Sequence, residues 1–352
     1  MRIQQLRERL RALGAKPCHE ARVLRAWLQA QPLDRGRVAA GDFLPAPLRA
    51  ALPALTAELA GLACLRSAHP GADGSSRLLV SLTDGQTIES VLLLRDGLCV
   101  SSQVGCAVGC TFCMTGRDGL LRQLTSGEIV AQVVLGRSLR RVKKVVFMGM
   151  GEPAHNLDSV LDAIELLGTL GNIGHKNLVF STVGDARVFE RLPLGMVKPA
   201  LALSLHSSQA DVRAQLLPKA PRIEPAELVA QADAYGRTTG YPIQYQWTLI
   251  EGVNDTDEEV AGIVRLLKGR YGLMNFIPYN KTESPGLPGA MNFRRPTAER
   301  ITEIAQQLAN HGILTKLRQS AGQDVEGGCG QLRARYPEYA SEPVPMVMER
   351  GV

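Results

Sequence analysis

The chain of 352 residues has few aromatic side chains, no long apolar run and no internal repeat. Because aromatic residues make up only 5% of it, we do not expect an extended platform for stacking nucleic-acid bases, and phosphate contact is the more available binding mode. No apolar stretch reaches membrane-spanning length, and the opening MRIQQLRERLRALG lacks the apolar block of a signal peptide. We therefore expect no membrane partner and a cytoplasmic location.

Cysteine is also scarce, but its distribution is informative. Four of the seven cysteines lie between Cys99 and Cys113. An odd and clustered set does not fit the disulfide framework of a secreted protein, so metal binding or redox chemistry is the better interpretation. The net charge of +6 favours a polyanionic partner such as nucleic acid, although bulk charge alone is weak evidence.

The hydrophobic pattern predicts an α/β fold with two N-terminal additions. Leu6, Leu10 and Trp27 belong to sets of apolar residues at helical spacing, which indicates a small helical module. A later segment predicts a β-hairpin with Glu89 in its second strand. The predicted parts are a helical accessory module that binds RNA (1–62), a hairpin linker (63–91), a core (92–335) and a tail (336–352).

From Cys99 onward, predicted strands alternate with predicted helices. We place strands at 98–104, 145–150, 177–182, 199–205, 243–250 and 274–278. We place helices near 126–136, 157–169, 185–192, 208–216, 225–237, 256–268 and 297–310. Thr125 and Glu128 form a capping-box signature before the first of these helices. Six parallel βα units suffice for a partial (β/α)6 barrel, whose chemistry collects at the C-terminal strand ends.

Cys106, Cys110 and Cys113 have the spacing Cys-x3-Cys-x2-Cys after the first predicted strand of the core. Structural zinc normally takes four protein ligands, and a fourth is not evident from the sequence. In a 4Fe-4S cluster each iron takes a separate thiolate, so three cysteines leave one iron open. A bidentate amino acid could chelate that iron. The cluster is the favoured interpretation, and zinc remains the alternative.

Six blocks along the chain carry a family resemblance. They occupy residues 99–113, 147–153, 203–206, 252–255, 275–280 and 329–332. Together they resemble the RlmN/Cfr family of radical S-adenosylmethionine (SAM) RNA methyltransferases, over about residues 85 to 335. The resemblance implies a partial (β/α)6 barrel of the radical SAM type and methylation of an adenosine in 23S ribosomal RNA.

The resemblance also implies cofactors, partners and binding residues. It implies one 4Fe-4S cluster on the cysteine trio, two SAM molecules per turnover and an external one-electron donor such as flavodoxin. The target carbon is C2 of adenine, with a transfer RNA adenosine as a second candidate substrate. The alternatives are C8 methylation by the same machinery and a zinc-stabilised RNA-binding protein without catalysis. The residues matched to SAM binding are Gly151, Glu152, Ser181, Ser204, Leu205, His206 and Asn280.

Three further residues match the family's catalytic groups. Cys329 matches the cysteine that carries the methyl group, and Cys99 matches the thiol that resolves the covalent RNA adduct by forming a disulfide. Glu89 matches the proton acceptor; desolvation in an apolar strand would raise the pKa of such a carboxylate. From pattern alone, Glu89 could be an exposed strand residue, Cys99 a small buried residue and His206 a core histidine.

Two other features bear on RNA recognition. Arg137, Arg140, Arg141, Lys143 and Lys144 form a basic run that could contact phosphates around an extruded adenine, or could be a solvated surface. Family members commonly have Asp-Ile-Asp-Ala-Ala before the methylated cysteine, whereas this chain has Asp-Val-Glu-Gly-Gly at 324–328. The two glycines predict a more mobile loop.

Overall fold

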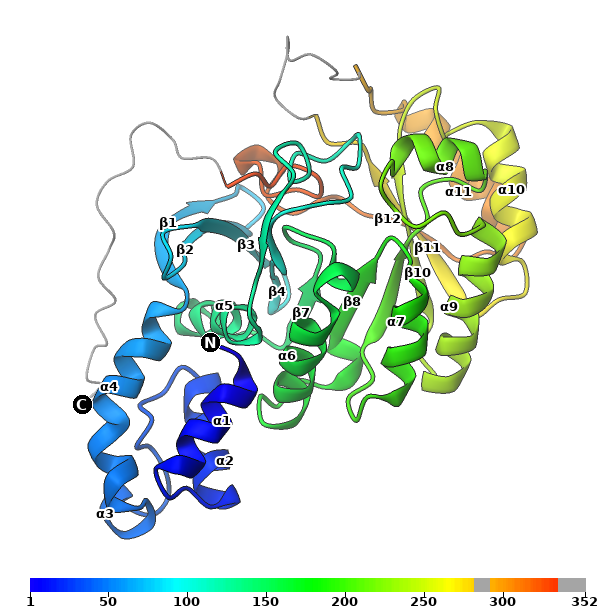
Figure 1. The fold of residues 1–352 in the computed structure, drawn as a ribbon. Helices are drawn as coiled ribbons and strands as arrows, with labels where there is room; N and C mark the ends of the chain where they lie inside the picture. The colour runs from blue at the N-terminus through cyan, green and yellow to red at the C-terminus, as the bar shows by residue number, and fades with distance from the viewer. Residues whose placement is uncertain (282–291, 335–352) are drawn as a thin grey trace.

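A twisted ten-stranded sheet organises the chain in the computed structural model, which describes residues 1–281 and 292–334. Neighbouring strands are antiparallel from β1 to β4 and parallel from β4 to β12 (Figure 1). In their order across the sheet, the strands are β1 (Cys64–Pro70), β2 (Ser76–Ser81), β3 (Thr87–Leu93), β4 (Gly97–Cys99), β7 (Lys144–Phe147), β8 (Leu178–Thr182), β9 (Ala200–Ser204), β10 (Ile243–Leu249), β11 (Gly272–Pro278) and β12 (Thr315–Leu317).

Helices cover the outer face of the parallel strands (Figure 1). The covered strands are almost wholly buried: Leu201 and Leu203 of β9 and Phe180 of β8 have no exposed surface. Burial on both faces explains why these strands read as continuous apolar runs. The helices are α5 (Ser126–Leu139), α6 (Leu157–Thr169), α7 (Ala186–Arg191), α8 (Ala210–Leu216), α9 (Pro225–Thr239), α10 (Asp257–Leu267) and α11 (Ala298–Asn310).

The N-terminal helices pack beside α5, and their buried apolar residues are continuous with the hydrophobic core of the sheet (Figure 1). They are α1 (Ile3–Ala12), α2 (Pro17–Leu28), α3 (Ala40–Phe43) and α4 (Ala46–Gly61). The Arg137 guanidinium joins them to the core by donating to the backbone oxygens of Leu28 at 2.6 Å and Gly171 at 2.8 Å. Arg137 therefore has a structural role here, which differs from its predicted place in a phosphate-binding run.

The predicted α/β fold with a mainly parallel sheet is confirmed, with three differences in its strands. The predicted strand 98–104 is divided, because β4 ends at Cys99 and β5 (Gln103–Gly105) pairs with β6 (Leu120–Gln123) in a separate two-stranded sheet. The predicted hairpin has a third strand, β1. The parallel part has a seventh strand, β12, which is only three residues long and does not lie in an apolar run.

Local signals place most of the helix ends correctly. The capping box before α5 is confirmed: the Thr125 hydroxyl accepts from the Glu128 N–H, and the Glu128 carboxylate accepts from the Thr125 N–H. Threonines 256 and 297 cap α10 and α11 through their side-chain oxygens. Within residues 1–281 and 292–334, no helix combines the length and apolar character needed to cross a membrane.

Candidate active site

A cavity of about 150 Å³ lies at the C-terminal ends of the parallel strands. It brings together the cysteine trio, the turn that follows β7, polar residues from β8 to β11, and the distant Cys329. The predicted site residues that line this first cavity are Cys106, Cys110, Cys113, Gly151, Glu152, Ser181, Ser204, His206, Asn280 and Cys329.

Three predicted site residues lie elsewhere. Leu205 is fully buried behind the first cavity, where its N–H donates to the Gln246 backbone oxygen at 3.0 Å. Cys99 lines a second cavity of about 490 Å³ on the other side of Cys329. Glu89, on β3, belongs to the described lining of neither cavity.

The loop that carries the cysteine trio is held by backbone contacts at both ends. Cys106 donates from its N–H to the Gly119 oxygen at 2.9 Å, which closes the loop across the β5–β6 ribbon. Gly105 has a φ of +79°, and a Cβ there would lie 2.1 Å from the same Gly119 oxygen. Only glycine fits such a position, so the turn before Cys106 depends on it.

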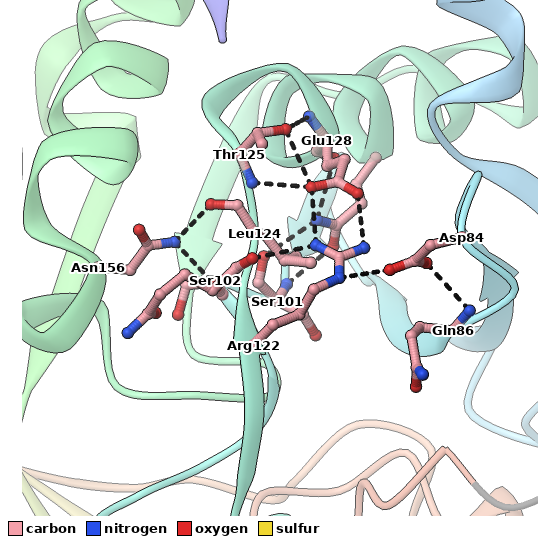
Figure 2. Close-up of polar contacts among 11 residues, drawn as sticks. Asp84, Gln86, Ser101, Ser102, Arg122, Leu124, Thr125, Glu128 and Asn156 are labelled. Atoms are coloured by element: carbon pink, nitrogen blue, oxygen red, sulfur yellow. Dashed lines mark hydrogen bonds and ion pairs between the residues drawn. The ribbon is translucent and has the colours of Figure 1, made fainter. Parts of the chain in front are cut away.

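A polar network anchors the β5–β6 ribbon to α5 and the hairpin (Figure 2). The Arg122 guanidinium donates to Asp84 at 2.6 Å and to Glu128 at 2.8 and 3.1 Å. The Asn156 amide donates to the backbone oxygens of Ser102 and Leu124 at 2.8 and 2.7 Å. Since β5 and β6 lead into and out of the cysteine loop, this network fixes the position of the loop.

The three thiols of the trio are desolvated and close to one another. Burial first, then the proximity of Cys113 and Cys106, raises the pKa of Cys110 well above its usual range. No group of three His, Cys, Asp or Glu side chains in the described part of the chain converges on a single ion position. The thiolates that hold a four-iron cluster lie farther apart than the ligands of a single ion, because each thiolate binds a different iron. The trio supplies three such thiolates.

Gly151 and Glu152 form a polar turn on the wall of the first cavity. Gly151 has a φ of +101°, and a Cβ there would lie 2.5 Å from the Gln103 side chain. The Glu152 carboxylate is buried and accepts from the N–H groups of Ala154 and Val183, both at 3.1 Å. Burial raises the pKa of Glu152 to about 7, so a nearby cation would strongly favour its ionised form.

His206 is both bonded to backbone and exposed to the first cavity. The Thr248 N–H donates to His206 Nδ1 at 2.9 Å, which places the proton of the neutral ring on Nε2. Burial, reinforced by Arg213, lowers the pKa of His206 to about 3, so the ring is neutral near pH 7. Its edge packs against Phe112 of the cysteine loop, with ring centroids 4.8 Å apart.

Sequence reasoning missed two residues in or beside the first cavity. Gln246 of β10 is 3% exposed and lines the cavity, yet neither polar atom of its amide has a partner in the described structure. The Asn280 oxygen is also unpaired there. Arg213 of α8 is buried close to Cys110 and Glu152, and burial lowers its pKa to about 10. Unpaired buried amides facing a cavity point to a polar ligand, since buried polar groups are normally satisfied.

The loop that carries Cys329 spans the boundary between the two cavities. The Asn280 amide donates to the Cys329 backbone oxygen at 3.0 Å, and the Met114 N–H donates to Gly330 at 2.7 Å. A Cβ on Gly328 would lie 2.5 Å from the Gln331 amide oxygen, so a glycine there permits close packing within the loop. The Cys329 residue itself is exposed.

Cys99 and Cys329 both line the second cavity. Burial first, then the proximity of Cys329, raises the pKa of Cys99 to about 12, whereas the nearby Arg318 acts in the opposite direction. In this conformation the Cys99 thiol is protonated at neutral pH. Both cysteines are free thiols.

Glu89 is buried beneath the segment that follows Cys329. Its carboxylate pairs with Arg77 and accepts from the N–H groups of Arg333 at 2.7 Å and Ala334 at 3.0 Å. The alternative of a solvent-exposed strand residue is wrong, because Glu89 has no exposed surface. These donors occupy both oxygens of the carboxylate.

Comparisons with known proteins agree with this arrangement. The family model described as the radical SAM superfamily matches residues 100–267, which begin just before the cysteine trio and end in α10. A crystal structure of a radical SAM methyltransferase from Sphaerobacter thermophilus superimposes with a TM-score of 0.79. Its sequence is 34% identical, and the match covers 95% of this chain and 98% of that one.

Sequence relatives extend the similarity over nearly the whole chain. A protein named as a probable RNA methyltransferase from Azoarcus sp. strain BH72 is 71% identical over 343 residues, which cover 97% of each protein. A protein with the same description from Pseudomonas aeruginosa strain UCBPP-PA14 is 64% identical, covering 97% of this chain and 98% of that one.

Proposed function

The chain belongs to the radical SAM methyltransferases, and from that premise we propose that it methylates a carbon of an adenosine in RNA. The RNA substrate is supported by the names of the sequence relatives. We further propose the RlmN/Cfr type, C2 of a 23S ribosomal RNA adenosine as the target, and work in the cytoplasm with a one-electron donor such as flavodoxin.

The residues of the first cavity fit the family's cofactors. Cys106, Cys110 and Cys113 would hold a 4Fe-4S cluster, and the unpaired amides of Gln246 and Asn280 offer polar contacts to SAM. When bound, the cluster and SAM supply the methyl group and the one-electron chemistry that an unactivated carbon requires. Glu152, whose raised pKa reflects burial, would pair with the SAM ammonium group.

Cys329 carries the methyl group in this proposal. Adenine C2 lies between electron-withdrawing nitrogens and is a poor nucleophile, so direct displacement at a sulfonium methyl is not open to it. A cysteine sulfur is a good nucleophile and can take that methyl group first. The supporting observation is the position of Cys329, which lies on the boundary between the cavity of the cysteine trio and the cavity of Cys99.

Cys99 and Glu89 complete the turnover. Once the methyl carbon has joined the adenine, Cys329 is tethered to RNA through a thioether. Glu89 takes the proton from the substituted carbon, and the odd electron of the adduct would pass to the bound cluster. The Cys99 thiol must lose its proton before its sulfur attacks the Cys329 sulfur. The bond between the Cys329 sulfur and the methylene carbon then breaks with its electron pair on the carbon, which takes up a proton to become the methyl group, and a disulfide forms as the methylated RNA leaves. For Glu89 to act, the segment carrying Arg333 and Ala334 must move away from its carboxylate.

The test uses cysteine variants of the anaerobic holoenzyme. Cys329→Ala should keep its cluster absorbance and lose RNA methylation, and Cys99→Ala should accumulate RNA crosslinked to protein. Cys18→Ala is the control, because Cys18 is exposed on α2, outside both cavities. Continued methylation by Cys329→Ala, or clean product release by Cys99→Ala, contradicts the proposal.

The position of the methyl group is read from the product. RNA from cells with and without the gene is digested to nucleosides and compared with 2-methyladenosine and 8-methyladenosine standards. We expect the 2-methyl product to depend on the gene. A gene-dependent 8-methyl product would assign the C8 chemistry to the same cysteines. If cells without the gene lost neither methylated nucleoside, that result would contradict the proposed function.

A further inference from the structure

The second cavity lies at the seam where the curved sheet fails to close. Its lining includes Leu93 of β3 and Cys99 of β4 together with Lys316 and Leu317 of β12. Strands β4 and β12 bound the parallel part of the sheet and are not hydrogen-bonded to each other. Curvature alone brings them to one cavity, with the loop of Cys329 along its edge.

All charged residues in the described lining of this cavity are cationic. They are Arg95, Lys144, Lys316 and Arg318. None of the four forms an ion pair with a carboxylate within residues 1–281 and 292–334. Burial, Arg318 and Lys316 together lower the pKa of Lys144, which shows that these cations lie near enough to repel one another. Repulsion among unpaired cations is relieved when an anion binds between them.

We propose that the second cavity is the nucleotide site, in which the phosphates of the target RNA segment bind Arg95, Lys144, Lys316 and Arg318. This inference rests on the proposed RNA methylation and names where the substrate binds. A volume of about 490 Å³ is in the range of cavities that hold small-molecule groups, about 300–1,000 Å³. A nucleotide in this cavity would lie beside Cys329, which also lines the first cavity.

The chemistry of the lining favours phosphate contact over base stacking. The described lining contains no aromatic side chain, in agreement with the low aromatic content of the chain. Affinity must then come mainly from charge, which supplies most of the non-specific free energy of nucleic-acid binding. Base selection is left to the position of the reactive sulfur and to the shape of the cavity.

The cationic site differs from the basic run that the sequence suggests. Arg140 donates to the backbone oxygens of Gly74 and Leu93, so it is structural, as Arg137 is. Arg141 and Lys143 pair with Asp96 at 3.7 and 3.9 Å. Only Lys144 of that run lines the cavity, where strand β12 supplies its cationic neighbours.

The test measures RNA binding by a double variant of the anaerobic holoenzyme. Lys316→Gln/Arg318→Gln removes two charges and keeps polar side chains of similar reach. The matched control is Arg265→Gln/Lys268→Gln, which removes two exposed charges at the end of α10. Fluorescence anisotropy with labelled, protein-free 23S ribosomal RNA is recorded from low to physiological salt concentration.

We expect the cavity variant to bind RNA at least about tenfold more weakly at low salt. The slope of its log affinity against log salt concentration should correspond to about two fewer phosphate contacts. The control should change neither quantity appreciably. Equal affinity and salt dependence in the cavity variant and the parent would overturn the inference. Equal losses in the control would also overturn it, because they would reflect net charge and not this site.

A second measurement separates this inference from the proposed function. Each protein is incubated with SAM and reductant without RNA, and methylation of Cys329 is measured by mass spectrometry. Parent-like methylation in the cavity variant shows that it is folded, so its loss of RNA affinity then supports the site. Absence of methylated Cys329 in the parent contradicts the proposed function, whatever the binding result. The single variant Lys316→Gln, at an exposed position, replaces the double variant if that one does not fold.

Discussion

The backbone N–H of Arg333 donates a 2.7 Å hydrogen bond to the Glu89 carboxylate, although the two residues lie 244 positions apart. The same oxygen accepts from Ala334, and the other oxygen pairs with Arg77. The segment after Cys329 is thereby fastened to hairpin strand β3, directly over the residue proposed to accept a proton. Release of this contact would free both the Cys329 loop and the Glu89 carboxylate.

Glu89→Gln tests the proposed proton transfer. The amide retains an oxygen that can accept from Arg333 and Ala334, but it cannot take a proton from the substituted adenine carbon. Because general bases contribute about 100-fold to 10,000-fold, we expect turnover to fall by at least about 100-fold. RNA covalently attached to Cys329 should accumulate, and denaturing gels with labelled RNA would show it. Rapid turnover without an adduct would assign the proton to another group.

Arg77→Ala tests how the buried charge of Glu89 is stabilised. The Glu89 side chain is fully buried and that of Arg77 is 12% exposed, so removing the guanidinium leaves a buried carboxylate without its cation. We expect a loss of about 3 kcal/mol in the free energy of unfolding, measured with urea. As a control, Arg9→Ala breaks the exposed pair with Glu58 and should cost less than about 1 kcal/mol. Similar losses in both variants would contradict this account.

The reactivity of Cys99 follows from its burial. With a pKa of about 12, caused first by burial and then by Cys329, only about one thiol in 10,000 is ionised at pH 8. Iodoacetamide at pH 8 should therefore modify exposed Cys18 and Cys329 in the holoenzyme while sparing Cys99. Mass spectrometry of tryptic peptides gives the rates. Labelling of Cys99 as fast as Cys18 would show that the segment near Cys329 opens readily.

Much of the fold was predictable because its signals are local. Strand β9 lies in an apolar run of nearly its own length, and threonines mark the starts of several helices. Strand β12 gives no such signal, since two of its three residues are exposed and it is defined by its pairing with β11. The break after Cys99 was also missed, because it depends on backbone pairing: the N–H groups of Ser102 and Gln103 donate to the Met150 oxygen, which the sequence does not reveal.

The sequence predicts those parts of the site that lie in local motifs. It does not predict the parts that residues from distant strands form when the sheet curves. The spacing of the cysteine trio is readable from the chain, and so is the Gly151 turn after β7. The unpaired amide of Gln246 depends on what surrounds it, which one strand cannot reveal. Lys144 and Lys316 belong to opposite parts of the sheet, and their meeting requires the whole curved fold.

Gln246→Leu tests the polar lining of the first cavity. The buried amide has no partner in the described residues, so a ligand in the cavity should supply one. Replacing it with an apolar side chain of similar size should weaken SAM binding by about 1–2 kcal/mol, or roughly 5- to 30-fold. Equilibrium dialysis of the reconstituted protein with labelled SAM measures this. The control is Gln244→Leu, on the same strand but outside the described lining of the first cavity, and it should bind SAM as the parent does. Parent-like SAM binding by Gln246→Leu would show that the Gln246 amide does not belong to the SAM site.

The network of Arg122 predicts an acid-dependent loss of stability in the ribbon beside the cysteine loop (Figure 2). Burial acts to raise the pKa of Glu128, but hydrogen bonds from Arg122 and Thr125 outweigh it, so the pKa lies below the ordinary value of 4.5. A carboxyl with a lowered folded-state pKa contributes stability that is complete above its unfolded pKa. That contribution is lost as pH falls below about 4.5 and through the lower folded value.

Arg122→Met should therefore lower the stability of the metal-free protein at pH 6 by about 1–3 kcal/mol, because it leaves the partly buried Glu128 with fewer donors. The difference from the parent should shrink as pH falls below about 4.5, since protonation removes the same charged contact in the parent. Urea unfolding at pH 6 and pH 4 measures both effects. Arg191→Met, which breaks an exposed pair with Asp158, is the control and should change little at either pH. A constant difference between Arg122→Met and the parent across this range would mean that the guanidinium acts by packing and not through the Glu128 charge.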